Sequence, residues 1–258
     1  MLAIFCLRLA CGLIASLVLF SPSLVNPRFY RVHFLTALGL TAVAAFFGRE
    51  QSGIWLWGAL AVLVLAFVGS LVWSLDGAPG GKLVIGLTAL ALAITLVLAS
   101  RATYPGEPTE EGIVPATTLP GMVADDLTAA ALLGTATTAM LMGHSYLIAP
   151  SMSLTPLLRL LAGFFGALFV RTALAAAGLV SWTSAHSLVN LENETVLWLP
   201  VRWGVGLLAP LVLAWMARES AKIRSTQSAT GILYVAVICC FLGELTSQLL
   251  FSNTGYVL

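Results

Sequence analysis

Two histidines and one arginine in the sequence, His33, His144 and Arg159, have side chains suited to binding a ligand. Imidazole is a common axial ligand of haem b, and it can also hydrogen-bond the carbonyl of a quinone. Both histidines lie close to an end of an apolar segment, and polar side chains at such places often reach water without further purpose. The three residues are therefore candidates for a quinone or haem site, with two interfacial histidines as the alternative.

A second group of ionisable residues, Arg8, Arg171, Arg202 and Glu244, lies inside apolar segments. A charge in the hydrocarbon of a membrane is costly unless it is paired or faces a cavity. In one interpretation, Glu244 neutralises Arg171 or Arg202 and holds their helices together. In the other, three arginines against one glutamate leave positive charge for an anion, such as a lipid headgroup, a haem propionate or a carboxylate substrate.

The composition is that of an integral membrane protein. Of the 258 residues, 59% are hydrophobic and only 9% are charged, whereas soluble domains carry roughly a quarter charged residues. The formal net charge is +1 and there is no basic tract, so nucleic acid is not an expected partner. The lipid bilayer is the first partner that the sequence predicts.

Eight segments are long and apolar enough to be membrane-spanning helices, which need about 20 such residues. They are residues 2–20, 27–48, 53–74, 82–100, 126–148, 156–182, 196–217 and 229–251. A polar connection rich in Pro, Thr and Glu, residues 101–125, divides them into two four-helix sets, residues 1–100 and 126–258. We therefore predict an all-α membrane protein of about eight transmembrane helices.

The distribution of basic residues predicts the orientation of these helices. The connections after the first, third, fifth and seventh segments, with the adjoining helix ends, hold most of them: Arg28, Arg31, Lys82, Arg159, Arg218, Lys222 and Arg224. The opposite connections hold two arginines and most of the acidic residues, among which we count Asp125 and Asp126. The positive-inside rule then puts both termini on the non-cytoplasmic side, and we expect the membrane to be a bacterial inner membrane.

A rise of 1.5 Å per helical residue separates the two groups of candidate residues into two layers. His144 lies about 6 Å and His33 about 9 Å from the cytoplasmic ends of their helices, with Arg159 at a comparable depth. Arg171 and Glu244 each lie about 22 Å from that side, and the other two arginines lie about 9 Å below the opposite surface. Each group can therefore converge at one level of the bilayer.

Motifs of soluble enzymes are absent from the sequence: there is no Walker loop, H-E-x-x-H, G-x-S-x-G or dinucleotide-binding fingerprint. The four cysteines all lie in predicted spans without a C-x-x-C pair, so no metal site is predicted from them. Whether the chain is an enzyme stays open at this point.

Three functions fit these observations. Short connections and the lack of a catalytic extramembrane domain favour a membrane subunit of a larger complex, of the respiratory or electron-transfer kind. In its sharper form, His33, His144 and Arg159 line a quinone or haem site near the cytoplasmic face. The alternatives are a small-solute or lipid transporter with Arg171, Arg202 and Glu244 as its polar centre, and a structural or assembly protein with no ligand of its own.

Overall fold

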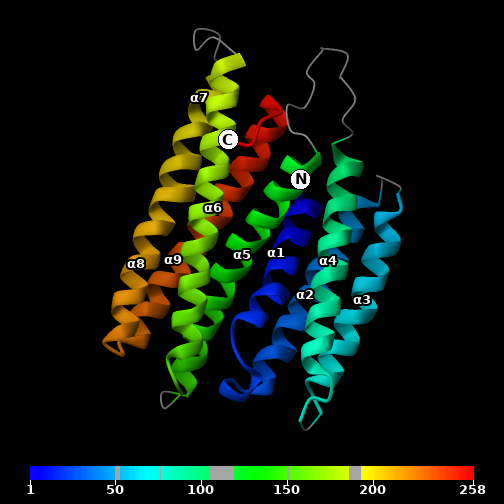
Figure 1. Cartoon of the computed structure of the whole chain (residues 1–258), viewed down its shortest axis with the longest axis vertical. Helices are drawn as coiled ribbons and strands as arrows, with labels where there is room; N and C mark the ends of the chain where they lie inside the picture. Colours follow the sequence, from blue (N-terminus) through cyan, green and yellow to red (C-terminus); the bar gives the residue numbers. More distant parts are fainter. Residues whose placement is uncertain (50–52, 76, 105–118, 150–151, 186–192) are drawn as a thin grey trace.

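All regular elements in the described part of the chain are helices, and they run side by side in one bundle (Figure 1). The computed structural model describes residues 1–49, 53–75, 77–104, 119–149, 152–185 and 193–258. The α-helices are α1 (Leu2–Ser16), α2 (Pro27–Gly48), α3 (Trp55–Val72), α4 (Gly81–Thr103), α5 (Leu119–Ile148), α6 (Thr155–Ala185), α7 (Asn193–Pro200), α8 (Ala209–Lys222) and α9 (Thr226–Thr254).

Seven helical stretches among the described residues are long and apolar enough to cross a membrane. They correspond to α1 with the turn after it, α2, α3, α4, α6, the continuous run from α7 to α8, and α9. The outer faces of the bundle carry large apolar side chains, such as Phe169 (77% exposed) and Val180 (65% exposed). Such an exterior suits hydrocarbon rather than water. The described part of the chain is therefore all-helical, and its apolar helices are compatible with an integral membrane protein.

Both ends of the chain lie at one end of the bundle, which we call the termini end (Figure 1). The opposite end is formed by the turns that follow α1, α3, α5 and α8 (Figure 1). The predicted start of α2 at residue 27 is correct, since the Asn26 side chain accepts a hydrogen bond of 2.9 Å from the Arg28 amide and Pro27 occupies the first turn.

The first helix is shorter than the predicted segment 2–20. Regular α-helix ends at Ser16, and two short 3₁₀ helices follow, η1 (Leu17–Leu19) and η2 (Pro22–Leu24). The Ser16 hydroxyl donates to the Leu13 carbonyl at 2.8 Å and lies 2.6 Å from the Thr138 hydroxyl of α5. The chain thus reaches the opposite end of the bundle through η1 and η2 rather than through a full helix.

The fifth helix begins seven residues before the predicted position 126. It starts at Leu119, with Pro120 in its first turn, a position where proline costs no hydrogen bond. Asp125 and Asp126, expected in the polar connection, consequently lie two turns inside the helix and are buried. This correction changes the interpretation of the charged residues.

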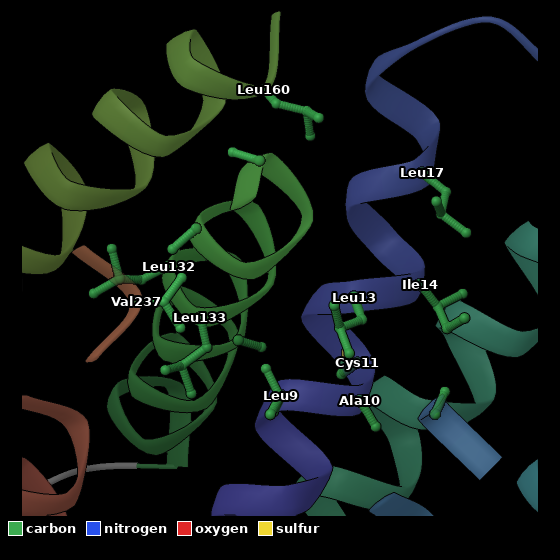
Figure 2. Close-up of a cluster of buried hydrophobic side chains, with 14 of the residues drawn as sticks. Leu9, Ala10, Cys11, Leu13, Ile14, Leu17, Leu132, Leu133, Leu160 and Val237 are labelled. Atoms are coloured by element: carbon green, nitrogen blue, oxygen red, sulfur yellow. The ribbon is translucent and has the colours of Figure 1, made fainter. Parts of the chain in front are cut away.

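Helix α5 lies at the centre of the packing and contacts α1, α6 and α9. Its Leu132 and Leu133 belong to the same buried apolar cluster as Leu9 and Leu13 of α1 (Figure 2). A Cβ atom on Gly134 would lie 2.0 Å from the backbone carbon of Gly12, so α1 and α5 cross almost backbone to backbone. Small residues at such crossings are how membrane helices approach closely.

The segment from α7 to α8 is one continuous helical run interrupted by a π-helical stretch, η4 (Val201–Leu208). It lies between Pro200 and Pro210, and Pro210 has no amide hydrogen to continue an α-helical ladder. Gly206 of η4 packs against Gly243 of α9, where a Cβ on Gly206 would lie 2.5 Å from the Gly243 Cα. This close crossing brings Arg202 of η4 next to α9.

Candidate functional sites

Arg171 and Glu244 form the centre of a buried charge cluster. Both side chains are fully buried, one on α6 and one on α9. The Arg171 guanidinium donates two parallel bonds to the Glu244 carboxylate, from Nε to Oε1 at 2.9 Å and from Nη2 to Oε2 at 2.8 Å. Nη2 also donates to the Ser247 hydroxyl at 3.2 Å, and Nη1 donates to Asp125 of α5. Such a two-pronged contact is the strongest form of an arginine–carboxylate pair.

Arg8 of α1 extends the cluster to the two aspartates of α5. Its Nε donates to Asp126 Oδ1 at 2.9 Å, and its Nη2 donates to Asp125 Oδ2. Its Nη1 lies 3.8 Å from Glu244 Oε2. Asp125 therefore bridges Arg8 and Arg171, and the cluster ties α1, α5, α6 and α9 together.

Arg202 is the least satisfied member of the cluster. Its Nη1 donates to Glu244 Oε1 at 3.0 Å, and its Nε donates to the main-chain oxygen of Leu258 at 3.1 Å. Its Nη2 is buried without a hydrogen-bond partner among the described residues. One buried donor is thus left over in an otherwise well-bonded network.

Of the two interpretations of this layer, the pairing of Glu244 with Arg171 or Arg202 is confirmed. The alternative, surplus positive charge, is wrong because Asp125 and Asp126 join the cluster. Three arginines face three carboxylates, and the charges balance. The neighbouring cavity, lined by Arg8, Asp125, Asp126 and Gln248 among others, has a volume of only about 10 Å³. That is room for about one water molecule. The geometry therefore suits a set of ion pairs that hold the helices together rather than a binding site for an anion or a solute.

The two aspartates are the residues that the sequence reasoning misplaced. Their position next to a Pro- and Thr-rich connection favoured a solvent-exposed helix start. The signal that points to them is electrostatic: three arginines in one membrane layer need three carboxylates, and Glu244 supplies one.

His33 is buried in α2 and has one free ring nitrogen. Its Nδ1 lies 2.8 Å from the carbonyl oxygen of Phe29, one helical turn earlier, so Nδ1 carries the hydrogen of this bond in a neutral imidazole. Its Nε2 is buried and has no hydrogen-bond partner among the described residues. With Nδ1 protonated, Nε2 presents a lone pair, and it can accept a hydrogen bond or bind a metal.

His33 and His144 line the same pocket, although they come from different helices. The pocket lies between the start of α2 and the end of α5 and has a volume of about 360 Å³. Its polar lining includes Asn26, Arg28 and Ser145, and its apolar lining includes Phe29. The Phe29 and His33 rings lie 4.3 Å apart between centroids. We call this the histidine pocket; His144 is exposed at it, whereas His33 is buried.

Arg159, the third residue of the predicted site, does not line the histidine pocket. Its exposed side chain lines a different cavity, together with Lys82 of α4 and residues 17–22. The shared depth of Arg159 and the two histidines is thus not a shared site, because depth along a helix does not specify the direction in which a side chain points.

The described residues contain no group of three or more His, Cys, Asp or Glu side chains placed to hold a metal ion. Comparisons of the sequence and structure with protein-family models, with curated proteins and with solved structures found no match. The two sites above are therefore interpreted from their own chemistry.

Proposed function

We propose that this protein is a membrane subunit that binds a quinol or quinone in the histidine pocket, as part of an electron-transfer complex. The observation that carries the proposal is that His33, whose buried Nε2 has no hydrogen-bond partner among the described residues, lines a pocket of about 360 Å³. A buried polar atom without a partner is costly, and a pocket lined by the same residue favours a ligand that supplies the missing hydrogen bond.

The chemistry of the pocket matches a quinol ring. The hydroxyl of a quinol would donate to His33 Nε2, because the Nδ1 bond to Phe29 leaves Nε2 as an acceptor. The Phe29 ring offers an apolar surface for the flat ring of the ligand. His144 is exposed and lines the same pocket, so it is suited to pass a proton between the ligand and water. In this proposal the electrons pass to or from a partner subunit.

A haem b is the second candidate for the same pocket, and one observation favours it. A histidine that ligates a metal usually donates its other ring N–H to a carbonyl or a carboxylate, and His33 makes such a bond to Phe29. His144, on the same pocket, would be the second axial ligand. A reduced-minus-oxidised spectrum and a pyridine haemochrome assay of the purified protein decide between the two, since only the haem gives absorption bands.

The proposal includes the membrane arrangement. We infer that α5 is the eighth transmembrane helix, since it lies among the seven apolar stretches and its charged residues are neutralised by Arg8 and Arg171. We also place the termini end on the non-cytoplasmic side of a bacterial inner membrane, which puts the histidine pocket near the cytoplasmic face.

The binding test uses the purified protein in lipid nanodiscs titrated with decylubiquinone. His144→Ala changes an exposed side chain, and we expect it to weaken binding about tenfold, as for the loss of one hydrogen bond of about 1.4 kcal/mol, while leaving the unfolding temperature unchanged. Thr36→Ala is the control, because Thr36 lies on α2 but is not among the residues lining the pocket. Equal affinities of the His144→Ala and unaltered proteins would refute the role of His144.

A further inference from the structure

A groove of about 430 Å³ runs along the outside of the bundle between α1, α5 and α6. Helices α1 and α6 both pack on α5, which forms the floor of the groove. The lining is rich in small residues, namely Gly12, Ala15, Ala131, Gly163, Gly166 and Ala167. Gly166 is exposed, and a Cβ atom there would have no other atom within 4 Å, so the groove is open at this point.

The groove extends toward a basic cavity at the end of the bundle opposite the termini. This cavity has a volume of about 370 Å³, shares Leu19 with the groove, and is lined by Lys82 and Arg159. The short helix η1, which contains Leu19, packs against both α4 and α6 and so separates the helices that carry the two basic residues. From Arg159 to Val170 of α6, groove and cavity together span about 16 Å, roughly one leaflet of a 30 Å hydrocarbon core.

The charge of the cavity has no counterpart in the described part of the chain. The carboxylates whose side chains are described there are Asp125, Asp126, Glu219 and Glu244. Three of them belong to the buried cluster, and Glu219 pairs with Arg218 and Lys222. Among the described residues, Lys82 and Arg159 therefore have no carboxylate partner, which favours an anion bound between them.

We propose that this groove binds one anionic phospholipid. An acyl chain lies along α5 between α1 and α6, and the phosphate headgroup lies between Lys82 and Arg159. A neutral lipid would fill the apolar groove equally well, so the two basic side chains set the selectivity. Basic pockets between membrane helices recognise anionic headgroups in this way, and each basic residue at a membrane surface contributes roughly a fivefold factor. Two of them predict a preference of about 25-fold at low ionic strength.

The test measures lipid retention by native mass spectrometry of the protein in mild detergent. Phosphatidylglycerol and phosphatidylcholine with the same acyl chains are added in equal amounts. We expect one phosphatidylglycerol to be retained, and we expect Lys82→Gln with Arg159→Gln to abolish the preference. Arg31→Gln with Arg224→Gln is the control, since it removes the same charge from residues that do not line the cavity. Equal retention of both lipids by the unaltered protein, or an undiminished preference in the first double variant, would overturn the proposal.

A second variant tests the position of the acyl chain. Gly166→Phe fills the groove without a backbone clash, and we expect it to lower phosphatidylglycerol retention at least tenfold. Gly86→Phe on α4 is the matched control, because Gly86 is also exposed and open but does not line the groove. Undiminished retention in folded Gly166→Phe protein would overturn the proposed position. If the unfolding temperature shows that Gly166→Phe does not fold, the charge variants, which alter only exposed side chains, decide the proposal.

Discussion

Glu244 is the residue on which the buried charge cluster depends most. It accepts hydrogen bonds from both Arg171 and Arg202 and lies 3.8 Å from a nitrogen of Arg8. A buried ion pair adds little stability relative to an apolar pair, but removing one partner leaves an uncompensated charge in a medium of low dielectric constant. These charged side chains can therefore be buried at low cost only when the helices that carry them are correctly packed together.

At the residue scale, Glu244→Gln should lower the free energy of unfolding by about 3–5 kcal/mol, because it leaves the arginines with one carboxylate too few. Adding Arg202→Gln restores the charge balance and removes the donor that has no partner, so the double variant should be more stable than Glu244→Gln alone. Thermal unfolding of Glu244→Gln, Arg202→Gln and the double variant in detergent measures the coupling. Strictly additive effects would show that the two side chains do not interact.

At the scale of the helices, the sequence predicted the positions of most helices well. The two clear errors are the end of α1, which lies at Ser16, and the start of α5, which lies at Leu119. Hydropathy together with the helix-start signal of Asn26 and Pro27 placed α2 at its observed ends. It could not place the start of α5, because Asp125 and Asp126 look like solvent-exposed residues until their arginine partners on α1 and α6 are known. Pairing between distant helices has no signal in local composition.

The candidate sites show the same limit. A constant rise per residue was enough to predict that His33 and His144 lie at one level, and they do line one pocket. It was not enough for Arg159, which lines another cavity, because the rotation of α6 about its axis depends on how α6 packs against α5. The depth of a residue in the membrane can be predicted from its position along a helix. The direction in which its side chain points depends on how the helix packs against its neighbours.

The crossing of α1 and α5 gives a prediction at this scale. Gly134→Ala would place a Cβ atom 2.0 Å from the Gly12 backbone, so the two helices must separate, and we expect a clear fall in the unfolding temperature. Gly39→Ala on α2 meets no atom within 4 Å, and the better helix propensity of alanine should leave the stability equal or slightly higher. Similar unfolding temperatures for the two variants would contradict the close crossing.

At the scale of the whole molecule, the orientation in the membrane decides which compartment the two proposed sites face. The histidine pocket and the basic cavity both lie at the end formed by the turns after α1, α3 and α5. If the positive-inside rule holds for this chain, both open toward the cytoplasm and the buried charge cluster lies in the outer leaflet.

Labelling of one introduced, exposed cysteine at a time in intact bacterial cells tests this orientation. With Cys239→Ser as the background, since the other three native cysteines are buried, Asn253→Cys at the termini end should react with a membrane-impermeant maleimide. Ser153→Cys, in the turn after α5, should react only after the membrane is permeabilised. The reverse pattern would place the termini in the cytoplasm.

The most direct test of the central proposal is to map where a quinone binds. The protein in lipid nanodiscs is photolabelled with an azido-quinone, with and without an excess of decylubiquinone, and the modified peptides are identified by mass spectrometry. The proposal predicts adducts within residues 25–33 and 141–152 that the excess quinone suppresses. Adducts elsewhere on the bundle, or labelling that the excess does not reduce, would contradict a quinone site at His33 and His144.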